Sequence, residues 1–226
     1  MHELMLYGRI ARQKVFKMNR FYCLKITLKD THRPVWRRFV VPANIRLDDF
    51  HNTIQTIMGW DNGHLHAFET GNARRSRKWY KASEHIDDDG WDDSLPEEKY
   101  TLQSLLSEKG AKIRYLYDFG DSWDHDILLE NPNYDDPDQP APIFCIKGVG
   151  ACPPEDCGGV SGFEDFCEAI ADPKHPKYKE FKEWYDGKYD PGHFDLDSIN
   201  EELGVERPAT STKKTKKTAT KKGTAT

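Results

Sequence analysis

A single amphipathic segment at residues 47–58 constrains the fold of this chain more than any other feature. Its apolar residues recur at the three- and four-residue spacing of a helix with one buried face, namely Leu47, Phe50, Ile54, Ile57 and Met58. Asp48 and Asp49 stand in the first turn, where carboxylates favour the positive end of a helix, and Gly59 follows as a stop signal. A helix of this kind must cover its apolar face with another layer of structure.

Strand-like segments on both sides of this helix supply such a layer. Residues 21–29 and 36–41 are rich in aromatic and β-branched side chains with a break between them, which predicts an antiparallel hairpin. Residues 64–69 alternate as a strand does. Residues 113–119 and 124–130 predict a second hairpin that turns at Gly120-Asp-Ser122.

Helical patterns dominate the last third of the chain. The polar, acidic residues 71–99 predict a long mobile excursion, followed by a short helix over 101–109. Three helices are then expected, the first opened by a capping box of Ser161 and Glu164, the others over 176–186 and 195–203. This order predicts an α+β fold: a mixed sheet from two hairpins plus one strand with a central helix, compatible with a β-grasp-like sheet, and then a C-terminal helical segment.

Length and composition indicate one domain with two tails. We expect a flexible leader over residues 1–20, in which Met18 is an alternative start, a single domain over 21–207, and a disordered lysine-rich tail over 208–226. No apolar run is long enough to span a membrane and no secretory signal is evident, so we expect a cytoplasmic protein without a membrane partner. In that reducing compartment the five cysteines favour metal binding or burial over disulfides.

A collinear series of motifs runs from about Phe21 to Leu203. It includes Pro34-Val-Trp-Arg-Arg38, His64-Leu-His66, Tyr117-Asp-Phe-Gly-Asp-Ser-Trp-Asp-His125 and Cys152-Pro-Pro-Glu-Asp-Cys-Gly-Gly159. In this series the chain resembles the plasmid pRiA4b ORF-3-like family. The resemblance implies a protein associated with mobile elements such as plasmids and insertion elements, and it implies no particular biochemical activity.

Two metal sites are candidates. The first, for zinc, consists of His125, Cys145, Cys152 and Cys157, because zinc prefers thiolate and imidazole ligands and short glycine-rich loops let them converge. Burial of these cysteines as small apolar side chains is the alternative. The second uses His64 and His66, which would share one face of a strand, completed by Asp118, Asp121 or His125. Packing of the two rings near the sheet edge is its alternative.

Four carboxylates are candidate catalytic residues: Asp118, Asp121, Glu155 and Asp156. The rigid Pro153-Pro154 backbone precedes Glu155 and Asp156 and would aim a carboxylate as a general base; a capping role or binding to backbone amides is the alternative. Neither the phosphate-binding G-x-x-x-x-G-K-[ST] motif nor the G-x-S-x-G motif occurs. Whether the protein is an enzyme therefore stays open.

The clearest feature for binding polyanions is the tail, whose six lysines have no acidic residue among them: Lys213, Lys214, Lys216, Lys217, Lys221 and Lys222. Such a segment binds the phosphates of DNA or RNA without reading sequence, while improved solubility is the alternative. The favoured hypothesis is a non-enzymatic binding module whose partner is nucleic acid or another protein. The alternative is a metal-dependent hydrolase or nuclease.

Overall fold

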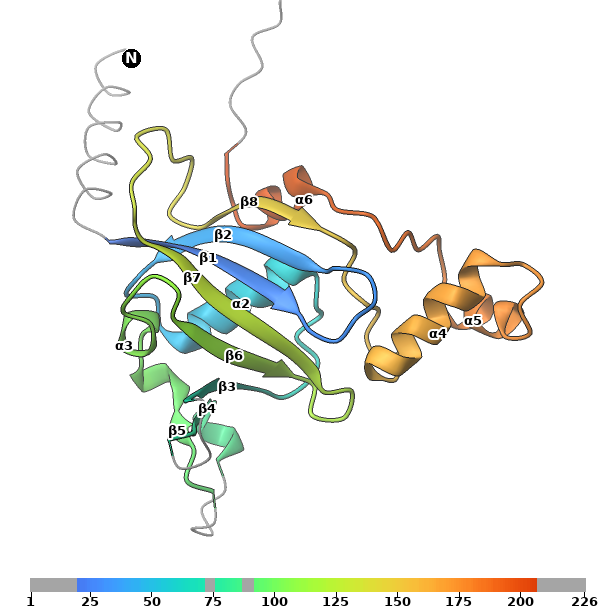
Figure 1. The fold of residues 1–226 in the computed structure, drawn as a ribbon, viewed down its shortest axis with the longest axis horizontal. Coiled ribbons are helices and arrows are strands. Elements are labelled where there is room, and N and C mark those ends of the chain that lie inside the picture. Colours follow the sequence, from blue (N-terminus) through green and yellow to red (C-terminus); the bar gives the residue numbers. More distant parts are fainter. Residues whose placement is uncertain (1–19, 72–75, 87–91, 207–226) are drawn as a thin grey trace, which may run out of the picture.

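An eight-stranded mixed sheet lies at the centre of the computed structural model, which describes residues 20–71, 76–86 and 92–206 (Figure 1). With five helices around that sheet, the described chain is α+β as expected. The leader, except for residue 20, and the lysine tail fall outside the described residues. No helix within the described ranges is long and apolar enough to cross a membrane.

Antiparallel pairing dominates the sheet. The strands are β1 (Phe21–Leu28), β2 (Trp36–Pro42), β3 (His66–Thr70), β4 (Lys78–Lys81), β5 (Leu95–Pro96), β6 (Lys112–Tyr117), β7 (Trp123–Tyr134) and β8 (Phe144–Val149). Their order is β5-β4-β3-β6-β7-β1-β2-β8, and only β4 and β5 pair in parallel. Both predicted hairpins, β1–β2 and β6–β7, are confirmed. The second hairpin lies between β1 and β3.

The predicted central helix is confirmed as α2 (Leu47–Met58), which packs across one face of the sheet (Figure 1). Phe50 is fully buried and lies between Phe39 of β2 and Phe68 of β3, with ring centroids 6.2 and 5.7 Å away. These rings fix the helix across strands that are distant in the sequence, since aromatic contacts add to the free energy of burying their surface.

The opposite face of the sheet is polar around β3, β6 and β7, while Phe21, Cys23, Val40 and Phe144 form a second, small apolar cluster. Arg114 of β6 donates to Glu69 of β3 and to Asp124 of β7, each at 2.7 Å, and Lys29 reaches the same Asp124 at 3.0 Å. Since strand side chains alternate between faces, the residues between these charges point into the core. The sheet therefore has a layer of helix on one face and paired charges around β6 on the other.

Arg37 departs from this division because it is a charged residue inside the core, 2% exposed. Its guanidinium donates to the carbonyls of Ile57 at the end of α2 (3.0 Å) and of Val149 at the end of β8 (2.9 Å), and it lies 4.8 Å from the Phe194 ring. Burial lowers its pKa. Arg37 thus ties β2, α2 and β8 together at the end of the helix.

The C-terminal helices are α4 (Gly159–Ala171), α5 (Tyr178–Trp184) and α6 (Leu196–Glu202). The expected cap of α6 is confirmed, because the Asp195 side chain accepts from the Ser198 amide at 3.0 Å. The predicted capping box of α4 is wrong. The helix begins at Gly159, two residues before Ser161, after Gly158 takes a left-handed φ of 90°.

Three local predictions need correction. The segment 71–99 is not simply an excursion, since its described part contains β4, β5 and the 3₁₀ turns η1 (Ser83–His85) and η2 (Glu97–Lys99). The helix expected over 101–109 shortens to α3 (Leu102–Leu105). Residues 144–149, expected as loop, form β8, because their backbone pairs with the edge of β2.

Candidate functional site: a histidine and carboxylate cluster beside a polar pocket

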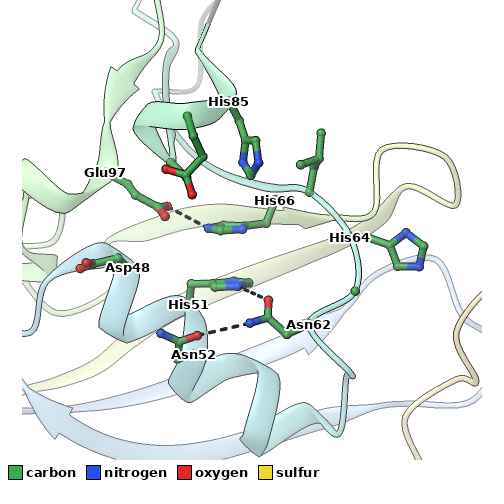
Figure 2. Close-up of a pocket in the computed structure, with 12 residues that line it drawn as sticks. Asp48, His51, Asn52, Asn62, His64, His66, His85 and Glu97 are labelled. Atoms are coloured by element: carbon green, nitrogen blue, oxygen red, sulfur yellow. Dashed lines mark hydrogen bonds and ion pairs between the residues drawn. The ribbon is translucent and has the colours of Figure 1, made fainter.

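A pocket of about 510 Å³ opens where α2, the segment before β3, η1 and η2 meet (Figure 2). Its lining is polar and rich in histidine: Asp48, His51, Asn52, Asn62, Gly63, His64, Leu65, His66, Ala82, Glu84, His85 and Glu97. Among the described residues, neither lysine nor arginine lines it. The volume falls within the range of small-molecule sites, about 300–1,000 Å³.

A closed ring of hydrogen bonds fixes His51 at the base of this pocket. The Gln55 amide donates to the Tyr115 hydroxyl, which lies 2.8 Å from His51 Nδ1, and His51 Nε2 lies 2.6 Å from Asn62 Oδ1. The backbone amide of Asn62 donates back to Gln55 Oε1 at 2.8 Å. This arrangement assigns the proton to Nε2 and uses both ring nitrogens. Burial, and then the neighbouring His66, lowers the pKa of His51 to about 4, so it is neutral at physiological pH.

His66 lies flat on His51, with ring centroids 3.4 Å apart and planes within 2° of parallel. Its Nε2 lies 2.9 Å from Glu97 Oε2, and both side chains are almost fully buried, at 7% and 3% exposed (Figure 2). The Glu97 carboxylate accepts the Nε2 proton of His66, which fixes the orientation of the ring.

His64 points away from His51 and His66, on the other side of the segment that leads into β3 (Figure 2). Three carboxylates surround it: Asp156 Oδ1 lies 3.3 Å and Glu155 Oε2 3.7 Å from Nε2, and Asp118 Oδ2 lies 3.8 Å from Nδ1. Among the described residues, His64, Asp118 and Asp156 form the one group of three histidine, cysteine or carboxylate ligand atoms within 4.8 Å of one another. We call these three residues, together with Glu155, the His64 cluster.

The two carboxylate oxygens of Glu155 have different surroundings. Oε1 accepts from the Tyr117 hydroxyl at 2.9 Å and from the Asp61 amide at 2.8 Å. Burial, followed by Glu155 itself, raises the pKa of Tyr117, which keeps the hydroxyl as a donor. Oε2 is buried without a hydrogen-bond partner in the described structure and faces His64. One oxygen is therefore anchored and the other is available to a ligand.

Asp118 repeats this arrangement. Its Oδ1 accepts from the Gly120 amide at 2.9 Å, while Oδ2 is directed at His64. Asp118 and Asp156 both have left-handed backbones, with φ of 54° and 55°, and Asn62 on the pocket wall has φ of 57°. This conformation is uncommon outside glycine, and such residues gather at functional sites.

Of the four catalytic candidates, three therefore join His64, while Asp121 has a different place. Asp121 Oδ2 accepts from the Gly158 amide at 3.0 Å, which joins the 118–122 turn to the loop that carries Glu155 and Asp156. Asp121 thus joins the two loops, and the other three carboxylates on these loops lie around His64.

The predicted zinc ligands do not come together. His125 is fully buried on β7, Cys145 lies on β8, and no three of His125, Cys145, Cys152 and Cys157, all of them described, have ligand atoms within 4.8 Å of one another. Burial raises the pKa of Cys145 to about 11 and of Cys157 to about 12, and lowers that of His125 to about 4. The Cys145 backbone amide donates to Asn200 Oδ1, and Asn200 Nδ2 donates to the Cys145 carbonyl. These two hydrogen bonds attach α6 to β8.

The His64 and His66 pair also separates, because β3 begins at His66 and the two rings have different partners. Sequence reasoning missed His51, Asn62 and Glu97, which define the pocket. His51 lies within the predicted helix 47–58, and Glu97 lies in the segment 71–99 that was expected to be mobile. The six lysines of the tail lie outside the described residues.

Comparison with known proteins agrees with the sequence resemblance. The family model described as plasmid pRiA4b ORF-3-like protein matches residues 20–198. The chain is 38% identical over 163 residues to the uncharacterized protein y4hQ of Sinorhizobium fredii, covering 71% of this chain and 78% of that one. The crystal structure of MM3350 from Methanosarcina mazei Go1, a protein of unknown function, is similar with a TM-score of 0.67 and 31% identity, over 79% of this chain and 96% of that one. This chain belongs to the plasmid pRiA4b ORF-3-like family.

Proposed function

We propose that the protein is a metal-dependent hydrolase that holds a divalent ion in the His64 cluster. His64, Asp118 and Asp156 have ligand atoms within 4.8 Å of one another, and Glu155 Oε2 lies 3.7 Å from His64. One imidazole with carboxylates is a set of donors that suits Zn²⁺ or Mn²⁺. This proposal follows the hydrolase hypothesis from the sequence, with Glu155 and Asp156 in place of His66, Asp121 and His125.

The observation that carries the proposal is the buried, unpartnered Oε2 of Glu155. A buried acceptor left without a partner costs about 1–3 kcal/mol, and more when it is charged. An ion beside His64 removes this cost. Asp156 Oδ1 and Glu155 Oε2 lie 3.3 and 3.7 Å from Nε2 of His64, close to the roughly 3.4 Å between neighbouring ligands of a tetrahedral ion with bonds of about 2.1 Å.

A bound ion lowers the pKa of its water and so supplies a nucleophile at neutral pH. The pocket next to the cluster provides room for a substrate, and the buried pair of His66 and Glu97 lies on its wall. The pocket contains three carboxylates and neither lysine nor arginine, which disfavours a phosphate chain. A small neutral or cationic substrate is therefore favoured over a nucleic acid at this site.

Titration calorimetry of chelator-treated full-length protein with Zn²⁺ and with Mn²⁺ tests the metal claim. Glu155→Gln and Asp118→Asn each remove one charged donor while keeping shape, and we expect the affinity to fall about 10–100-fold. Asp126→Asn, on the polar face of the sheet, is the matched control and retains wild-type affinity. Equal affinity in all four proteins would place the ion elsewhere.

An ester-hydrolysis assay tests the second half of the proposal. Metal-loaded protein is expected to hydrolyse p-nitrophenyl acetate faster than Glu155→Gln at the same free metal concentration. Binding of the metal without any difference in rate would leave a metal-binding protein and refute the hydrolase.

Contact with nucleic acid is a separate proposal and rests on the tail. Six lysines without an acidic residue between 208 and 226 form a segment that neutralises phosphates in a salt-dependent manner. This role does not use the His64 cluster.

A further inference from the structure

A second pocket lies at the end of the molecule where α5 packs on α4 and the chain turns back after α5 (Figure 1). Its volume is about 430 Å³, within the range of small-molecule sites, about 300–1,000 Å³. Four aromatic side chains line it together with Ile170, namely Tyr178, Phe181, Tyr185 and Tyr189. No described residue lines both this pocket and the one beside His66.

The core holds the aromatic wall of this second pocket in place. Phe166 of α4 is fully buried. Around it, edge to face, lie the rings of Phe181, Tyr185 and Tyr189, with centroids 5.5, 5.5 and 5.1 Å away. The Tyr189 hydroxyl donates to the Cys152 carbonyl at 2.9 Å, which ties the wall to a second loop. Rings that are ordered before a ligand arrives reduce the conformational entropy that binding costs.

The charged side chains of the lining carry one net positive charge. Lys182 and Lys188 line the pocket against a single carboxylate, that of Asp190. The Lys182 ammonium donates to the Gly187 carbonyl at 2.5 Å, which uses one of its three donors. Asp190 Oδ1 accepts from the Gly192 amide within its own turn. Both lysines are exposed, so their ammonium groups stand at the mouth of an aromatic cavity.

We propose that this pocket binds a small aromatic carboxylate. A flat ring contacts the aromatic wall in the offset or edge-to-face geometry that aromatic pairs prefer, and the carboxylate accepts hydrogen bonds from Lys182 and Lys188. One net positive charge matches a singly charged group and not a phosphate chain. A cation is attracted by aromatic faces too, but here it would meet two ammonium groups.

Three probes with one ring and different charge test the proposal: 2-naphthoate, 2-naphthalenemethanol and 2-naphthalenemethylamine. Each is titrated calorimetrically into full-length protein at neutral pH and low salt. EDTA is present, so the result does not depend on an ion in the His64 cluster. We expect saturable binding of the carboxylate, about tenfold weaker binding of the neutral alcohol because the charge-assisted hydrogen bonds are lost, and the weakest binding of the amine.

Variants locate the site. Lys188→Gln removes one charge, and we expect about three- to tenfold weaker binding of 2-naphthoate with the alcohol unaffected. Tyr178→Leu keeps an apolar side chain without the ring and is expected to weaken both probes. Lys179→Gln is the matched control, because Lys179 is exposed on α5 and does not line the pocket.

The control variant retains wild-type affinity if the site is the second pocket. Absent binding of 2-naphthoate, equal affinity for all three probes, or equal loss in Lys179→Gln and Lys188→Gln overturns the proposal. Tighter binding of the amine than of the carboxylate also overturns it and would show a site for aromatic cations.

Discussion

At the scale of single residues, the site is made by giving the two oxygens of one carboxylate different surroundings. Glu155 and Asp118 each use one oxygen to accept hydrogen bonds from the protein and direct the other at His64. Anchoring of this kind holds a ligand in place before an ion arrives, which reduces the ordering that binding requires.

The sequence identified several of these residues but not their grouping. Proline and glycine around Glu155 and Asp156, and around Asp118, marked rigid loops with chemical side chains. Their approach to His64 depends on the contact between Asp121 and Gly158, 37 positions apart, for which a local pattern carries no information. Cysteine spacing suggested zinc, but Cys145 lies on β8 and no three of the four proposed ligands come close together.

Acid sensitivity is predicted from two buried rings. Burial holds the pKa of His51 and of His125 at about 4, below the ordinary 6.5. Because the folded protein binds the proton more weakly than the unfolded chain, stability is complete above pH 6.5 and falls as the pH drops toward 4. By pH 5 each ring accounts for about 2 kcal/mol of lost unfolding free energy. Urea denaturation between pH 7.5 and 5 measures this.

His125→Phe is expected to remove about half of that pH dependence, since one of the two titrating rings is gone. His32→Gln is its control, because the His32 side chain is 80% exposed. A wild-type unfolding free energy that does not change between pH 7.5 and 5 would show that the buried rings are not neutral in the fold.

At the scale of elements, periodicity predicted those strands and helices whose own sequence carries an apolar pattern. The hairpins and α2 carry clear patterns, and each was confirmed. Strands β4, β5 and β8 were missed, because they are short or polar and owe their conformation to an existing strand edge. Because β4 and β5 were not predicted, the pocket wall containing Glu97, which follows β5 directly, was not predicted either.

Arg37 gives a test at this scale. It joins β2 to the ends of α2 and β8 through buried carbonyls, which Arg37→Met would leave without donors. We expect the free energy of unfolding to fall by about 2–4 kcal/mol. Arg38→Met is the matched control on the polar face, where loss of the pair with Glu130 is expected to cost less than about 1 kcal/mol. Equal effects in urea denaturation would refute the special role of Arg37.

At the scale of the whole molecule, charge is divided unequally along the chain. The net charge is −5, and setting aside the six lysines of the tail leaves −11 for residues 1–207. An acidic body repels nucleic acid while a basic tail attracts it. The proposed metal site and the proposed contact with nucleic acid therefore use different parts of the chain.

Deletion of residues 208–226 is therefore expected to abolish most binding to duplex DNA at low salt, and to flatten the dependence of affinity on salt, since the phosphate-neutralising lysines are gone. Fluorescence anisotropy with two unrelated duplexes measures this and is expected to show no preference between them. A truncated chain that binds DNA as the full chain does would contradict a role for the tail.

The central claim is that the His64 cluster holds a divalent ion, and anomalous diffraction at the zinc edge from a crystal grown with Zn²⁺ tests it most directly. The account predicts a peak about 2.0–2.2 Å from a ring nitrogen of His64 and from Glu155 Oε2. A peak at Cys145, Cys152 or Cys157 alone, or none at saturating Zn²⁺, would contradict it.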